Sequence, residues 1–142
     1  MAERKVFVTK RSTFEACHSL PNYEGKCSRL HGHSYKLEVT VSGVVDYEHF
    51  EYEDADEIAT EAMAIDFSDI KRIIDHCITE RYDHSNLNDH FNYPTAEIMA
   101  IHFFEILSEK INKGNTSVVS VRLWETEDSY AEYFGERVGD SK

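Results

Sequence analysis

The chain has 142 residues, the length of one domain, and 41% of them are hydrophobic, which is enough to form a compact core. Its 15 basic and 27 acidic residues give a formal net charge of −12, and this balance argues against a nucleic-acid-binding protein. No apolar run approaches the roughly 18 residues of a membrane-spanning helix. Three cysteines without a Cys-x-x-Cys pair do not make a disulfide framework. We therefore expect one reduced domain, residues 1–142, in the cytoplasm.

Two strands are expected in the first third of the chain. In residues 5–18 and 31–45, apolar side chains recur at every second position, which is the period of a half-buried strand. The residues between them, 19–30, contain proline, asparagine and glycine and are expected to form a loop. The second strand carries His31 and His33 on its apolar face, and the first strand ends at His18 on the face that carries Phe14.

The charge is unevenly distributed along the sequence. Residues 1–36 hold seven basic and three acidic side chains, whereas seven of the twelve residues from Asp46 to Glu57 are acidic. We expect the acidic run to be a solvated loop or hairpin tip within an insertion at about residues 46–64. An anionic substrate would be repelled by the whole chain unless it docked where the basic surplus of residues 1–36 dominates.

Two helices are expected in the middle of the chain, because apolar residues are spaced three and four apart over residues 66–81 and 95–113. Asp66 and Thr95 are the candidate N-caps, and Gly114 is the candidate stop of the second helix. The second helix is expected to bury a stripe made of Ile98, Ile101, Phe104, Leu107 and Ile111.

A last pair of strands is expected after Gly114. Alternation places one set of residues on a common face, namely Val119, Val121, Leu123 and Glu125. The order strand, strand, helix, helix, strand, strand predicts an α+β fold (ββααββ), with an antiparallel four-stranded sheet and two helices packed on one face. The two edges of such a sheet are sites where neighbouring subunits can pair.

Three histidines form the strongest candidate site. His31 and His33 point the same way from one strand face, and His18 ends the preceding strand. If these strands pair, the three rings converge on one point. Three neutral imidazoles suit zinc, and a catalytic zinc keeps three protein ligands and an open position. The sequence therefore predicts a zinc site, although a single histidine in such a place would more often be a core residue.

Cys27 lies four residues before His31 and allows two interpretations. It is either a fourth ligand that closes a structural zinc site, or a base that lies near the metal without binding it. A thiol beside a cation and Lys26 would be partly ionised near neutral pH. Three histidines already suffice to hold the ion, which favours the open site.

Two further features carry possible chemistry. Asp83 and His84 are adjacent in the loop between the helices, where a carboxylate can orient and charge an imidazole, although most such pairs are merely solvated. Glu125 ends an apolar stripe, where a carboxylate needs a partner. That partner is either a cation in a salt bridge or a ligand with two adjacent N–H donors, such as the edge of guanine or a pterin.

Six short motifs occur in the order that is typical of one enzyme family. They are Phe14-x-Ala16-x-His18, Cys27-x3-His31-Gly32-His33-Ser34-Tyr35, Ile65-Asp66-Phe67, Asp83-His84-x-x-Leu87-Asn88, Pro94-Thr95-Ala96-Glu97 and Trp124-Glu125-Thr126. Together they resemble the 6-pyruvoyl-tetrahydropterin synthase family over about residues 6–134. Each motif is weak alone, but six in order are highly specific.

The resemblance implies the tunnelling fold and a homo-oligomer, usually a hexamer formed by two trimers, with active sites at subunit interfaces. It implies that His18, His31 and His33 hold one Zn²⁺ per subunit. Cys27 would be the general base, and Asp83 and His84 would complete a proton-transfer triad. Glu125 would anchor the pterin ring, and Thr95 would lie near that ring. No redox cofactor, nucleic acid or membrane partner is implied.

The three residues between Cys27 and His31 resemble the branch of the family that makes 6-carboxy-tetrahydropterin in queuosine synthesis. That branch converts 7,8-dihydroneopterin triphosphate to 6-carboxy-5,6,7,8-tetrahydropterin, acetaldehyde and triphosphate. The resemblance therefore implies a lyase-type enzyme. A 6-pyruvoyl-tetrahydropterin synthase, or another enzyme that makes a different side-chain product on the same scaffold, remains an alternative. A non-catalytic protein with a structural zinc is a further alternative.

Overall fold

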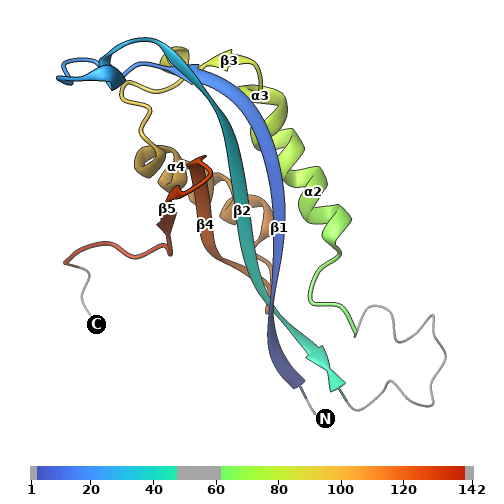
Figure 1. Ribbon diagram of the computed structural model, residues 1–142. Helices are drawn as coiled ribbons and strands as arrows, with labels where there is room; N and C mark the ends of the chain where they lie inside the picture. The colour runs from blue at the N-terminus through green and yellow to red at the C-terminus, as the bar shows by residue number, and fades with distance from the viewer. Residues whose placement is uncertain (1–2, 48–61, 140–142) are drawn as a thin grey trace.

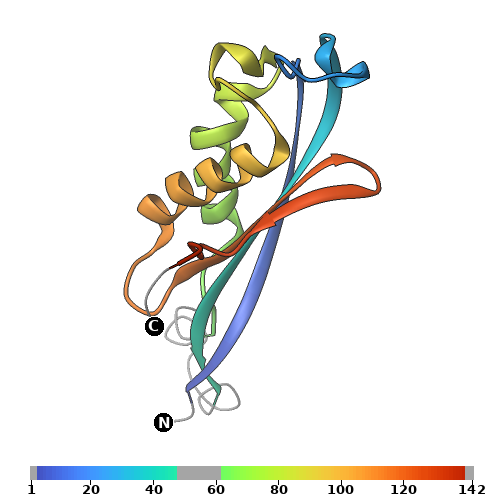
Figure 2. The same cartoon turned by 90° about the vertical axis from the view of Figure 1, so that its left-hand side faces the viewer.

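The computed structural model describes residues 3–47 and 62–139. A five-stranded sheet, in the order β3-β1-β2-β4-β5, forms one layer, and the helices cover one of its faces (Figures 1 and 2). The strands are β1 (Glu3–His18), β2 (His31–Asp46), β3 (Ser85–Asn86), β4 (Ser117–Thr126) and β5 (Ser129–Tyr133). The helical elements are η1 (Lys26–Ser28), α2 (Phe67–Ile74), η3 (Asp75–Thr79), α3 (Glu80–Tyr82), η4 (Leu87–Asp89) and α4 (Ala96–Ile111). The α+β class is as expected. Most of the acidic run 46–57 lies outside the described residues.

The sheet has one strand more than the predicted four. The additional strand, β3, comes from the loop between the helices and pairs in parallel with Ala16 and Cys17 of β1. The backbone N–H of His84 donates to the carbonyl of Glu15, and the Asp83 carboxylate accepts from the Glu15 N–H, so the loop is fixed to the edge of β1. A strand of two residues is too short to show alternation in the sequence.

The two helical segments begin where the sequence predicts. Asp66 accepts a hydrogen bond from the N–H of Ser68, and Thr95 accepts one from the N–H of Ile98. These side chains satisfy backbone donors that the first turn of a helix leaves unpaired. The first segment is continuous from α2 through the π-helical η3 to α3. No helix in the described part of the chain is long and apolar enough to cross a membrane.

The buried face of α4 differs from the predicted stripe. Ile98 and Ile101 are 47% and 36% exposed, although both were expected in the core. The face that packs against the sheet consists of Ala96, Met99, Ala100, Phe103, Leu107 and Ile111. Apolar residues lie on more than one side of this helix, so its periodicity alone does not fix the buried side. The two alanines of the observed face permit close approach to the sheet.

The corrected orientation of α4 gives a first prediction. Leu107→Ala should lower the free energy of unfolding by about 2–5 kcal/mol, because Leu107 is fully buried and its truncation leaves a cavity. Ile98→Ala should change it by no more than about 0.5 kcal/mol, as is usual for exposed positions. Denaturant unfolding of both variants measures the difference. A larger loss for Ile98→Ala would mean that the predicted stripe is buried after all.

Two irregularities in β4 position its side chains. Val41 pairs with Val118 and Thr40 pairs with Ser120, so Val119 is an extra residue without a partner in β2. As a result Val118 is buried, although the sequence pattern placed Val119 on the buried face. The second irregularity lies at Glu125, between the pairs that join Trp124 and Thr126 to β5. Bulges of this kind redirect side chains and are frequent beside functional sites.

Candidate metal centre and adjoining cavities

The three predicted histidines meet at one end of the sheet. His18 ends β1, His31 begins β2, and these two residues are direct partners in the antiparallel register. The candidate ligand atoms of His18, His31 and His33 all lie within 4.8 Å of one another. Because the glycine at position 32 separates His31 and His33 by one residue, both rings leave the same face of β2. The expected convergence of the rings is therefore present.

Backbone carbonyl groups orient two of the three rings. The Nδ1 atom of His18 lies 2.7 Å from the carbonyl oxygen of Pro94, and Nδ1 of His31 lies 2.7 Å from that of Arg29. A carbonyl oxygen can only accept, so each Nδ1 carries a proton, and in the neutral ring the lone pair is then on Nε2. This outer contact is the usual way in which proteins fix a metal-binding histidine.

The Nε2 atoms of His18 and His33 are buried and have no hydrogen-bond partner among the described residues. Buried polar atoms are rarely left in this state in a protein, unless an ion or a water satisfies them. The donor set consists of three imidazoles, which are ligands that zinc favours, and the fit to a divalent metal ion is therefore good.

The surroundings of His33 favour its neutral form. Burial lowers the pKa of His33, and the neighbouring His18 and His31 lower it further, whereas Glu125 acts in the opposite direction. The net lowering favours the neutral ring, whose lone pair a metal needs. An Oε1 atom of Glu125 lies 3.6 Å from Nε2 of His33, so the carboxylate lies beside the candidate centre.

Tyr35 is buried and contacts His18, although the sequence analysis assigned it no role. Its hydroxyl lies 3.3 Å from Nδ1 of His18, and its ring stacks on Phe14 with centroids 5.0 Å apart. Burial raises the pKa of Tyr35 far above its ordinary value, so the hydroxyl stays neutral. The only sequence signal was its position two residues after His33, on the same strand face.

Cys27 lies in η1, within the loop that joins β1 to β2, and is half-buried. Its carbonyl oxygen accepts a hydrogen bond of 2.9 Å from the N–H of Leu20, which ties this loop back to the end of β1. The metal-ligand cluster found among the described residues contains the three histidines and no cysteine. This composition favours the interpretation in which Cys27 does not close the coordination shell.

Asp83 and His84 form a hydrogen-bonded pair at the outer edge of β1. Nδ1 of His84 lies 2.9 Å from one oxygen of Asp83, and the other oxygen accepts from the N–H of Glu15 at 2.8 Å. The hydrogen bond from Glu15 and then the one from His84 lower the pKa of Asp83, so its carboxylate stays charged. The φ of His84 is +60°, a left-handed conformation uncommon outside glycine, and its side chain is 79% exposed.

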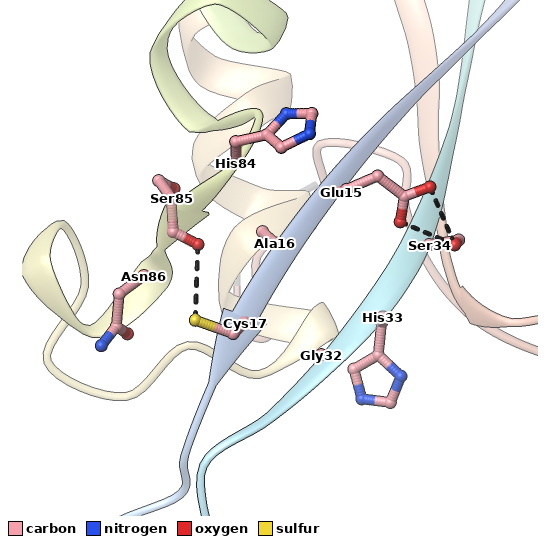
Figure 3. Close-up of a pocket in the computed structure, with 9 residues that line it drawn as sticks. All are labelled: Glu15, Ala16, Cys17, Gly32, His33, Ser34, His84, Ser85 and Asn86. Carbon is pink, nitrogen blue, oxygen red and sulfur yellow. Dashed lines mark hydrogen bonds between the residues drawn. The ribbon is translucent and has the colours of Figure 1, made fainter.

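His84 lines a cavity of about 540 Å³ that β1, β2 and β3 share (Figure 3). The cavity is lined by His84, Cys17 and Glu15, among others. The Glu15 carboxylate accepts hydrogen bonds from the hydroxyl of Ser34, which also lines the cavity. His33 also lines the cavity, but Figure 3 shows its ring turned away from the contact between Glu15 and Ser34. Cys27 is not among the lining residues.

Glu125 connects the histidine cluster to a second cavity, of about 410 Å³, between the start of α4 and β5. Glu97 and Glu132 also line this cavity, so its wall is acidic. Thr95 uses its hydroxyl to cap α4, and the preceding Pro94 orients His18, so the start of the helix adjoins the candidate centre. A cavity with carboxylate acceptors suits a ligand that presents N–H donors.

The fold and the cluster together define an α+β protein with three histidines positioned to bind a metal ion. The chain belongs to the 6-pyruvoyl tetrahydropterin synthase family, which it matches over residues 7–136. It is 36% identical to the 6-carboxy-5,6,7,8-tetrahydropterin synthase of Synechocystis sp., with 92% of this chain and 95% of that protein covered. It is 32% identical to the protein of the same name from Haemophilus influenzae, with 89% and 96% covered. The relatives are thus named as pterin synthases, which indicates an enzyme.

Solved structures support the fold independently. The chain superimposes on the 6-pyruvoyl tetrahydropterin synthase of Caenorhabditis elegans with a TM-score of 0.76 and 24% sequence identity, covering 96% of this chain and 99% of that one. At this identity the likeness concerns the arrangement of sheet and helices.

Proposed function

We propose that this protein is a zinc-dependent 6-carboxy-5,6,7,8-tetrahydropterin synthase. Its substrate would be 7,8-dihydroneopterin triphosphate, and its products 6-carboxy-5,6,7,8-tetrahydropterin, acetaldehyde and triphosphate. The observation that carries the proposal is the convergence of three imidazoles, two with buried unpaired Nε2 atoms, beside the carboxylate of Glu125. The names of the relatives and the spacing between Cys27 and His31 favour the carboxy product.

Each site residue has a distinct role in this proposal. His18, His31 and His33 hold the zinc ion, which when bound supplies Lewis-acid polarisation of the substrate's side-chain hydroxyls. Cys27 removes a proton from a side-chain carbon and returns it.

Glu125 accepts two N–H groups from the pyrimidine edge of the pterin, and a carboxylate has the two oxygens that this requires. Thr95 holds the start of α4 near the ring. Asp83 stays ionised and orients His84, which acts as the second acid and base.

The proposed triad of Cys27, Asp83 and His84 is best completed between two copies of the chain. His84 lines a cavity that Cys27 does not line, and the His84 side chain is largely exposed. A neighbouring subunit can therefore reach His84 and bring its own thiol to it. This arrangement agrees with a homo-oligomer, for which we propose a hexamer of two trimers.

Product analysis tests the function directly. Zinc-loaded protein is incubated with 7,8-dihydroneopterin triphosphate, and the products are identified by mass spectrometry. We expect 6-carboxy-5,6,7,8-tetrahydropterin together with acetaldehyde. Formation of 6-pyruvoyl-tetrahydropterin would instead support the sister activity, which is the activity in the name of the C. elegans protein of the same fold. No turnover of any pterin by the zinc-loaded oligomer would support a structural zinc module.

The role of Glu125 gives a second prediction. Glu125→Gln should raise KM for the pterin about tenfold to a hundredfold, because an amide offers one acceptor where the carboxylate offers two charged ones. Metal content and melting temperature should stay unchanged. Glu109→Gln is the matched control, since Glu109 is exposed on α4 and lines neither of the two cavities. A large drop in melting temperature for Glu125→Gln would assign the carboxylate a structural role.

A further inference from the structure

The loop that follows α3 runs along the outer edge of β1 and keeps one register with that strand. In the parallel pairing of β3 with β1, Ser85 lies opposite Ala16 and Asn86 lies opposite Cys17. Figure 3 shows the Cys17 thiol donating to the carbonyl of Ser85 across this pairing. We call residues 83–88 the edge segment. It begins with the acid–base pair described above and continues along β1 toward the end of that strand.

The side chain of Asn88 continues this register where the backbone of the edge segment turns away. A longer parallel strand would place residue 88 opposite Ser19, at the same sequence separation of 69 residues. Residues 87–89 instead form the short helix η4. The Asn88 amide accepts a hydrogen bond of 2.8 Å from the Ser19 N–H and donates one of 2.9 Å to the Ser19 carbonyl. An amide side chain offers the donor and the acceptor of a peptide group, so Asn88 takes the place of a backbone partner.

These two hydrogen bonds fix the residue that directly follows His18. The pairing of β1 with β2 ends at His18 and does not include Ser19. The next residue, Leu20, donates its N–H to the carbonyl of Cys27. The backbone that leaves His18 is therefore held by Asn88 before it enters the loop that carries Cys27.

The position of the His18 ring depends on this part of the backbone. The carbonyl of Pro94 holds Nδ1 of the ring, but the place of the whole side chain is set by the end of β1. Metal–ligand distances deviate by only about 0.2 Å from their usual values, so a small shift of the strand end would misplace Nε2. Leu87 is fully buried, and it anchors the edge segment in the core beside Asn88.

We propose that Asn88 is a positioning residue of the candidate metal centre, which fixes the end of β1 so that the His18 imidazole meets those of His31 and His33. The edge segment also carries His84, so it joins the proposed acid–base pair and a metal ligand along one strand edge. The inference rests on the metal binding in the proposed function, and it requires neither the pterin substrate nor the carboxy product.

Zinc affinity of the full chain tests the role of Asn88. Asn88→Ala should lower the affinity for Zn²⁺ about 10–100-fold, as is usual when an outer contact of a metal ligand is lost. Competition with a chromogenic chelator measures this affinity. Unchanged zinc affinity of Asn88→Ala would overturn the inference.

Leu107→Ala is the matched control for a general loss of stability. Leu107 is fully buried, so its truncation should destabilise the fold through a cavity. It lies roughly three turns along α4 from the helix start that adjoins the candidate centre. This variant should keep the zinc affinity of the parent. An equal loss of affinity in both variants would mean that Asn88 contributes only to stability, and would overturn the inference.

Asn88→Asp tests the same contact with a side chain of the same shape, in case the alanine variant does not fold. Its carboxylate still accepts from the Ser19 N–H, but it cannot donate to the Ser19 carbonyl. Zinc affinity should fall about tenfold. The added negative charge by itself attracts a cation, so this loss cannot be an effect of charge. An affinity equal to that of the parent or higher would count against the inference.

Hydrogen exchange examines the contact without any metal. In the metal-free protein, the Ser19 amide should exchange about fivefold to tenfold faster in Asn88→Ala, the equivalent of one lost hydrogen bond. NMR spectroscopy measures the rate at this single amide. An unchanged rate would show that Asn88 does not hold the end of β1 in solution.

Turnover of the same proteins separates this inference from the proposed function. If the parent forms a pterin product and Asn88→Ala keeps its zinc affinity, the role of Asn88 alone is refuted. If Asn88→Ala loses zinc affinity but the parent turns over no pterin, the function is refuted and the role of Asn88 stays in place.

Discussion

Replacing His33 with alanine should abolish both metal binding and turnover. The change removes one of three converging ligands, and we expect metal affinity to fall by more than the 10–100-fold that loss of an outer contact typically causes. Turnover should fall to the level of the metal-free protein. Metal content by mass spectrometry and initial rates with dihydroneopterin triphosphate measure the two effects.

The fold should tolerate this substitution. His33→Ala removes a buried Nε2 atom that has no hydrogen-bond partner in the described structure, and the metal-free variant should melt close to the metal-free parent. His76→Ala is the matched control, because its side chain is 79% exposed on the helical segment, and it should keep both metal and rate. Retention of one metal per subunit by His33→Ala would show that the centre lies elsewhere.

Replacing Cys27 with alanine should separate metal binding from catalysis. Turnover should fall by about 10²–10⁴, the usual contribution of a general base, while zinc content stays at one per subunit. The reason is that the three histidines converge without the thiol. Loss of zinc along with turnover would instead identify Cys27 as the fourth, structural ligand.

Cys77→Ala is the control for Cys27. Cys77 is also half-buried, but it lies on the helical segment, where burial raises the pKa of its thiol and keeps it unreactive. This variant should retain the activity and the zinc of the parent. An equal loss of turnover would indicate a general effect of removing a thiol rather than a role for Cys27.

Local patterns in the sequence were sufficient to predict the histidine cluster. Alternation placed His18 and His33 on inward faces, and the pairing of β1 with β2 then brought them together. The caps at Asp66 and Thr95 were likewise visible, because the cap and its backbone partner lie within three residues. The proposed roles of Cys27 and Glu125 stay predictions, since no measured property of the site tests them.

Features that depend on contacts between distant segments could not be predicted in this way. The extra residue at Val119, which changes the side chains that face the core, depends on the pairing of β4 with β2. The sequence of β4 alone does not indicate it. The buried side of α4 depends on which of its apolar faces meets the sheet. The partner that orients His18 is a backbone carbonyl, which any residue at position 94 would supply, so no residue type signals it.

The short turn at Pro94 and Thr95 performs two tasks with adjacent residues. The carbonyl of Pro94 orients the imidazole of His18, and the hydroxyl of Thr95 caps the first turn of α4. A displacement of the helix start is therefore transmitted to a candidate metal ligand without any change in the ligand itself. Engineering that lengthens or repacks this turn will alter metal affinity together with helix stability, and the two properties cannot be tuned independently.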